Sequence, residues 1–268
     1  MLKDITLGQF FPGKSPIHRM DPRTKILMLT VYIVLLFVSS NWISYGCMAI
    51  FLFTAIKIST IPPKAIVRGM KPVVIILVFT GVLNLFFTTG GTVLVDFWII
   101  TITTEGVVRA VFMMGRILML ISGTFLLTYT TSPISLTDGL ESLMKPLKKI
   151  HVPVHELAMM MCIALRFIPT LIEETDKIIS AQKARGADFE SGSLMDRARA
   201  LVPILVPLFI SAFRRADELA TAMECRCYQG DVGRTKMKLL RYSRLDLYAF
   251  CAGGVMSVII FTLKAFGL

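Results

Sequence analysis

The residues best suited to a chemical role are two arginines, Arg185 and Arg226, each at the predicted carboxyl end of a helix. A guanidinium group carries five N–H donors in a planar fork that fits a carboxylate, and the helix dipole favours a cation at this end. Small residues, Ala184 and Cys225, precede the two arginines, so a partner's surface can approach each helix closely. Gly186 permits the left-handed backbone that ends the first helix. We therefore expect two arginine tips, residues 184–186 and 225–227, that bind a partner.

The two arginine tips repeat one another in the sequence. Aligning residues 175–186 with residues 216–227 matches Asp176 with Asp217, Ala181 with Ala222 and Arg185 with Arg226. One arginine at a helix end fits an ordinary solvated side chain. A matched pair on neighbouring helices indicates a shared binding role.

Other candidate chemistry is weak. His151 and His155 lie four residues apart, a spacing that can ligate a metal on one helix face, but Pro153 lies between them and no further ligand cluster accompanies them. Cys225 and Cys227 offer only two thiols, which favours packing over a metal site. The sequence contains no Walker-type glycine loop, nucleophile elbow or zinc-protease motif. We expect no cofactor or metal, no catalysis and no ATP hydrolysis by this chain alone.

The composition is that of a polytopic membrane protein. Of the 268 residues, 54% are hydrophobic and 18% are charged, and the mean hydropathy is +0.69. These values exclude a soluble globular protein. The net charge of +11 marks cytoplasmic loops rather than a nucleic-acid site, because no basic tract is interleaved with aromatic residues. The five cysteines form no paired framework and imply no disulfide.

The elements that must position the arginine tips follow from the apolar runs. We expect a basic cytoplasmic lead-in at residues 1–25 and a membrane domain at residues 26–131 with four spans, which are 26–40, 42–58, 73–87 and 107–130. Residues 92–103 are rich in β-branched and aromatic residues and predict a short hairpin or interfacial segment outside the cell. Residues 231–268 form a basic flank and a fifth span at 245–266. The carboxyl terminus should therefore lie outside.

Charged helices fill residues 132–230, and we expect them to be long cytoplasmic coupling helices. One begins near Ser132, a second follows Pro153, and a third covers residues 194–228, with kinks expected at Pro169, Pro203 and Pro207. Two parts, 157–172 and 201–213, are apolar enough to suggest spans. They are short, contain proline and continue into charged helix, so we expect them along the inner membrane face. A topology with two additional spans is the alternative.

Two arginines fall inside the span at 107–130. Arg109 lies near the outer end, where snorkelling to the interface is expected. Arg116 lies deeper, and an arginine at that depth faces protein. Packing against protein carbonyls and a functional role are both open for Arg116.

The arginine tips carry a family resemblance. Ala184-Arg185-Gly186 and the region 222–228 around Arg226 resemble the paired Ala-Arg-Gly signatures of the transmembrane T component of energy-coupling factor transporters, which import vitamins and metals into prokaryotes. The layout of the whole chain is similar too, including the Asp-Pro-Arg-Thr-Lys sequence at 21–25. This sequence departs from the pattern at Cys225 and Cys227. Because position 227 holds cysteine and not glycine, we expect a left-handed helix end to be less favourable there.

The resemblance implies an all-α polytopic membrane protein of about five transmembrane helices in a prokaryotic cell membrane, with its coupling helices in the cytoplasm. Each arginine tip would dock on one of two ATP-binding cassette ATPase subunits, Arg185 on one and Arg226 on the other. A separate substrate-binding S component would hold the vitamin or micronutrient. Its platform would be the apolar helix faces between residues 153 and 213, with a methionine cluster at Met159, Met160 and Met161. Methionine surfaces can repack against different partners.

Two other classes of function stay open from the residues alone. A self-sufficient permease needs polar residues in several spans, and few beyond Asn84 and Arg116 are present. A membrane-embedded transferase needs acidic or histidine clusters at the cytoplasmic ends of spans, where Asp21 and Glu141 are a thin set. The coupling subunit is the leading hypothesis.

Overall fold

The computed structural model describes residues 10–88, 90, 92–97, 100–187, 189, 193–230 and 239–266. The first nine residues of the expected lead-in and the basic flank at 234–238 lie outside these ranges. The chain forms two compact units, which we describe separately. The bundle unit contains residues 8–140 and 240–268, and the two-helix unit contains residues 141–239.

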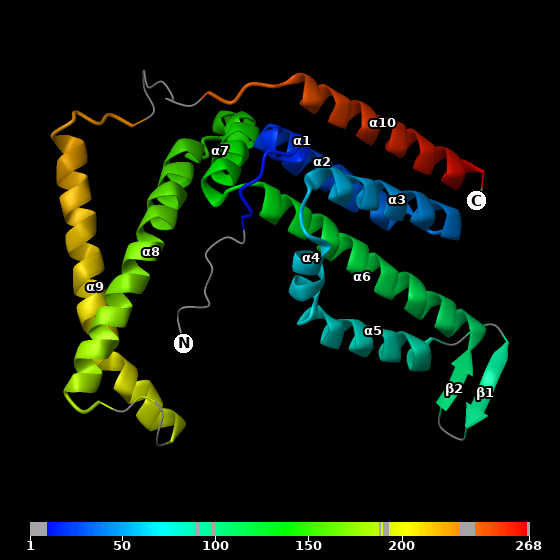
Figure 1. Cartoon of the computed structure of the whole chain (residues 1–268), viewed down its shortest axis with the longest axis horizontal. Coiled ribbons are helices and arrows are strands. Elements are labelled where there is room, and N and C mark those ends of the chain that lie inside the picture. The colour runs from blue at the N-terminus through cyan, green and yellow to red at the C-terminus, as the bar shows by residue number, and fades with distance from the viewer. Residues whose placement is uncertain are drawn as a thin grey trace. The chain divides into compact units, whose positions relative to one another are not determined.

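The bundle unit is almost entirely helical (Figure 1). Its helices are α1 (Pro16–Arg19), α2 (Pro22–Val38), α3 (Trp42–Ser59), α4 (Pro63–Met70), α5 (Val73–Phe87), α6 (Thr104–Thr130) and α10 (Arg244–Ala265). The expected all-α polytopic fold is confirmed by these helices. The expected hairpin is also present, because β1 (Val93–Phe97) pairs antiparallel with β2 (Ile100–Thr103).

Local capping fixes where the main helices begin. Asp21 caps α2, since its carboxylate accepts the Arg23 backbone N–H at 2.9 Å and Pro22 occupies the first helical position. Ser243 and Asp246 form a capping box at the start of α10. The two starts are joined, because the Asp21 N–H donates to Asp246 Oδ1 at 2.9 Å. The last helix therefore begins beside the first long one.

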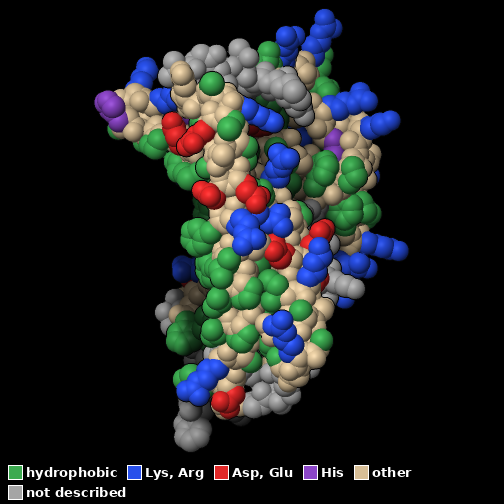
Figure 2. Space-filling model, turned by 90° about the vertical axis from the view of Figure 1, so that its left-hand side faces the viewer, with side chains coloured by type: hydrophobic (Ala, Val, Ile, Leu, Met, Phe, Trp, Pro, Cys, Tyr) green, Lys and Arg blue, Asp and Glu red, His purple; other side chains and the backbone are tan. Residues whose placement is uncertain are grey.

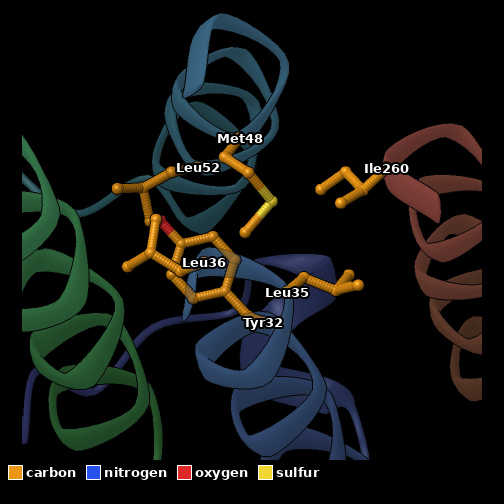
Figure 3. Close-up of a cluster of buried hydrophobic side chains, with 6 residues drawn as sticks. All are labelled: Tyr32, Leu35, Leu36, Met48, Leu52 and Ile260. Carbon is orange, nitrogen blue, oxygen red and sulfur yellow. The ribbon is translucent and has the colours of Figure 1, made fainter. Parts of the chain in front are cut away.

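A hydrophobic cluster fills the space where α2, α3 and α10 meet (Figure 3). Its buried side chains are Tyr32, Leu35, Leu36, Met48, Leu52 and Ile260. Gly253 lets α10 approach α2 closely, because a Cβ at this position would lie 2.5 Å from Met28 Cε. A second, smaller cluster joins α4 to α6 through Ile61, Ile66 and Tyr129.

The two arginines of α6 have different surroundings. Arg109 is exposed and pairs with Glu105, one helical turn away, at 2.6 Å. Arg116 turns inward: its Nε donates to the Tyr45 hydroxyl at 2.8 Å and its Nη2 donates to the Ser39 carbonyl at 3.3 Å. Arg116 thus packs against α3 and the end of α2.

Four described helices, α3, α6, α8 and α10, are long and apolar enough to cross a membrane. The pair α4 and α5, bent by 60° at its break, counts as a fifth if it forms one span. This set differs from the expected one in two members. The 17 residues of α2 lie at the lower limit for a span. α8 reaches span length because it continues through Pro169 as one helix.

The two-helix unit contains α8 (Val154–Ala184) and α9 (Leu194–Glu224). The unit also contains the 3₁₀ turn η1 (Lys145–Ile150) and the last residues of α7 (Pro133–Met144), which include Glu141. His155 Nδ1 lies 3.0 Å from Glu141 Oε1, which ties the start of α8 to α7. Figure 1 shows a change of direction within α9, which contains Pro203 and Pro207, and proline is the usual cause of such a bend.

Candidate functional site: two arginine tips

The first arginine tip ends α8 in a Schellman motif, in which two backbone bonds close the last turn. The Gly186 N–H donates to the Lys183 carbonyl at 3.0 Å, and the Ala187 N–H donates to the Gln182 carbonyl at 3.0 Å. Gly186 has a φ of 87°, the left-handed conformation that the sequence predicted. Arg185 is the last residue before this turn.

The second arginine tip ends α9 in the same way. The Cys227 N–H donates to the Glu224 carbonyl at 2.8 Å, and the Tyr228 N–H donates to the Met223 carbonyl at 3.1 Å. Each of these positions lies 41 residues after its counterpart in the first tip. Arg226 is again the last residue before the left-handed turn. The two helix ends are therefore equivalent in backbone hydrogen bonding.

Cys227 takes the left-handed conformation although it is not glycine. Its φ is 54°, and a residue with a Cβ pays roughly 1–2 kcal/mol in this region. The sequence indicated a less comfortable end here, and the structure shows that the two capping hydrogen bonds form nonetheless. Cys225 is ordinary by comparison, since its φ of −59° is right-handed helical.

Both guanidinium groups are on the surface. Arg185 and Arg226 are exposed, and so are the small residues Ala184 and Cys225 before them. Neither arginine forms an ion pair with any side chain in the described part of the chain. Each tip therefore presents five N–H donors and a narrow backbone turn to whatever approaches it.

Polar contacts hold α8 against α9. Glu174 of α8 accepts hydrogen bonds from the Ser211 hydroxyl and from Arg215 Nη2, the second at 2.9 Å. Nearer the first tip, Gln182 Nε2 donates to the Pro203 carbonyl at 3.3 Å. Both tips thus belong to helices that contact each other directly.

The Gln182 contact has a specific cause. In a regular helix the carbonyl of residue 203 would accept the N–H of residue 207, but Pro207 has no N–H. The Pro203 carbonyl is left without that partner, and the Gln182 amide supplies a donor from the other helix. Sequence reasoning identified the prolines as kinks and missed this role. The spacing of the prolines was visible in the sequence. When two prolines lie four residues apart in a helix, the carbonyl of the first always lacks its usual N–H donor.

The methionine cluster divides into two parts. Met159 is half-buried, and its sulfur accepts the Tyr228 hydroxyl at 3.0 Å, a contact the sequence did not predict. Met160 and Met161 are exposed by 57% and 47%. α9 also exposes large apolar side chains, namely Leu201, Val202, Leu205, Val206, Phe209, Ile210 and Phe213. In Figure 2 hydrophobic side chains form a band beside a strip of charged ones.

Comparison with known proteins gives a consistent result. The family model described as CbiQ, cobalt transport protein, matches residues 13–238. The energy-coupling factor transporter transmembrane protein of Thermosediminibacter oceani is 57% identical over 96% of this chain and 97% of its own length. The corresponding protein of Acidaminococcus fermentans is 52% identical over 99% and 97%, and that of Bacillus subtilis is 43% identical over 99% and 100%.

These matches cover nearly the whole chain, and the family match includes the positions of both arginine tips. They confirm the family resemblance. The apolar helices agree with a multi-pass membrane protein. The chain belongs to the CbiQ family and, within it, to the transmembrane T components of energy-coupling factor transporters.

Proposed function

We propose that this T component couples two ATP-binding cassette ATPase subunits to a substrate-binding S component that captures a vitamin or another micronutrient. The observation that carries the proposal is the pair of equivalent helix ends, each with an exposed arginine before a left-handed turn. Two equivalent tips suit two similar receptors. Each ATPase would supply a groove with a carboxylate that receives one guanidinium group.

Contact between the helices supports a coupling role. α8 and α9 are tied together by Glu174 with Arg215 and by Gln182 with the Pro203 carbonyl. When the two ATPases close on ATP, they would move the two tips, and the connected helices would carry that motion along their lengths. This chain would have no catalytic role, and the ATPases would hydrolyse ATP.

The apolar face of α8 and α9 is the proposed platform for the S component. Met160 and Met161 are exposed on α8, and α9 exposes Leu201, Leu205 and Phe209, which lie four residues apart on one helical face. Such a surface is stable only against lipid or an apolar partner. We place α8 and α9 along the inner face of the membrane, with the amino terminus in the cytoplasm.

Co-purification tests the docking of the ATPases. The tagged chain is extracted in mild detergent with its partners, and Arg185→Ala with Arg226→Ala is compared with a control, Arg166→Ala with Arg214→Ala. The control removes two exposed arginines from the same two helices, away from the tips. Loss of an interfacial charge pair typically costs about 2–5 kcal/mol, so the tip variant should lose both ATPases.

The partners retained decide the result. The proposal predicts that the control keeps the ATPases and that both variants keep a small membrane protein, which mass spectrometry would identify as the S component. If the tip variant retains its ATPases as well as the control does, the arginines are ordinary helix ends. A wild-type chain that purifies alone would favour the self-sufficient permease instead.

A further inference from the structure

The bundle unit contains a groove that the proposed coupling role does not use. It has a cavity volume of about 650 Å³, within the roughly 300–1,000 Å³ typical of ligand sites. Its lining residues come mainly from α1, α2, α3, α6 and α10. Its lining includes Lys25, Thr54, Ala55, Thr130 and Ala252, with Met20, Ile58 and Leu245 at one end.

The groove covers half the depth of a bilayer. It follows α10 from Leu245 to Met256 and α3 from Cys47 to Ile58, and at 1.5 Å per residue each stretch is about 16 Å long. The hydrocarbon core of a membrane is about 30 Å thick. The groove starts at the end where α2 and α10 begin, because Lys25 and Leu245 line it there. Its length matches one leaflet.

The wall of the groove is apolar in practice. The Thr54 hydroxyl donates to the Ile50 carbonyl at 2.8 Å, and the Thr130 hydroxyl donates to the Leu126 carbonyl at 2.7 Å, each within its own helix. Lys25 Nζ is 2.9 Å from the Thr130 carbonyl and bonds to two further oxygens of the protein. These groups are already satisfied, so the groove suits a hydrocarbon chain rather than a polar solute.

The end of the groove is positively charged. Exposed basic residues on two different elements each adjoin a lining residue in the sequence: Arg19 beside Met20 and Arg244 beside Leu245. Lys57, next to Ile58, instead lies over the Phe53 ring at 4.9 Å from its centroid, and Phe53 does not line the groove. The carboxylates of Asp21 and Asp246 at this end are buried, with 5% and 1% exposure. The accessible charge is therefore positive, which complements an anionic lipid headgroup.

We propose that the groove binds an acyl chain of an anionic phospholipid from the cytoplasmic leaflet, with the headgroup held by Arg19 and Arg244. A transmembrane helix of a partner is the competing occupant, and the test below distinguishes it from lipid. A lipid tail is thin enough to enter.

The test uses the full chain, stripped of lipid in detergent and offered equal amounts of phosphatidylglycerol and phosphatidylcholine with identical acyl chains. Native mass spectrometry counts the lipids retained. Ala252→Phe fills the groove, and Cys251→Phe is the matched control, because Cys251 is exposed on the same helix and does not line the groove. Ala55→Phe on α3 is a second filling variant if the first does not fold.

The headgroup is tested by charge. Arg19→Gln with Arg244→Gln is compared with Lys64→Gln with Arg68→Gln, which removes the same charge from exposed positions on α4. Each basic residue near an anionic lipid contributes about 1 kcal/mol, roughly fivefold in affinity. The first double variant should therefore lose at least tenfold of the preference for phosphatidylglycerol, and the second should retain it.

Three results would overturn the proposal: equal retention of the two lipids by wild type, equal lipid binding by Ala252→Phe and Cys251→Phe, or an equal loss of preference in both double variants. A fourth is the displacement of a co-purified membrane subunit, and not of lipid, by Ala252→Phe. That result would assign the groove to a protein helix. Selective loss of phosphatidylglycerol binding in the filling and headgroup variants supports the lipid proposal.

Discussion

Replacing Cys227 by glycine should strengthen the second arginine tip, whereas the same replacement at Cys225 should weaken it. The chemical change is identical, and the two positions lie two residues apart. They differ in backbone conformation, with a φ of 54° at Cys227 and −59° at Cys225. The sign of the effect therefore reports the left-handed turn and nothing else about the side chain.

The magnitude follows from two opposing terms. Glycine at position 227 removes the roughly 1–2 kcal/mol that a Cβ costs in the left-handed region. It also raises the conformational entropy of the open chain, which lowers the stability of the turn by about 0.4–1 kcal/mol. The net gain is on the order of 1 kcal/mol, or about fivefold in the opening equilibrium. At position 225, glycine only lowers the helix propensity, which destabilises the helix end by about 0.3 kcal/mol.

Hydrogen exchange of the Tyr228 amide measures this opening, because its N–H donates to the Met223 carbonyl at 3.1 Å and closes the turn. Exchange at this amide should slow about fivefold in Cys227→Gly and quicken slightly in Cys225→Gly. Gly186→Ala provides the reverse change at the first tip and should quicken exchange of the Ala187 amide. If both cysteine variants change the exchange rate of the Tyr228 amide in the same direction, the assignment of a Schellman motif to the end of α9 is wrong.

Two further predictions concern hydrogen bonds between helices. Tyr45→Phe removes the acceptor of Arg116 Nε and should lower the free energy of unfolding by about 1–3 kcal/mol, seen as a lower thermal midpoint in detergent; an unchanged midpoint would contradict an inward-facing Arg116. Gln182→Ala should cost about 1 kcal/mol in wild type and much less beside Pro207→Ala, which restores the N–H for the Pro203 carbonyl. A thermal double-mutant cycle measures this coupling, and additive effects would refute it.

Helix boundaries were largely predictable from sequence in the bundle unit. The expected spans 42–58 and 73–87 correspond to α3 (Trp42–Ser59) and α5 (Val73–Phe87). Asn41 and Pro72 precede the two runs, and each helix begins with the first apolar residue after them, although neither residue caps its helix through a side-chain hydrogen bond. α8 was harder, because Pro169 suggested an interruption while the helix continues through it. A proline removes one hydrogen bond, and whether the helix survives depends on its packing.

The positions of the two arginine tips could be predicted from the sequence, but the contacts that hold their helices in place could not. Arg185 and Arg226 were found because a repeated local pattern needs no knowledge of distant residues. The contacts of Gln182 with Pro203 and of Tyr228 with Met159 join positions 21 and 69 residues apart. No local pattern reports which side chains meet at such separations.

The sequence by itself determined that this protein is a helical membrane protein with two matched arginine tips, because hydropathy, helix caps and repeats are local properties of the chain. Only the tertiary structure decided that Arg116 faces Tyr45, 71 residues away, and that Cys227 accepts the conformation of a glycine. The first depends on how two helices pack. The second depends on the two hydrogen bonds of the helix end, whose gain outweighs the strain at one residue.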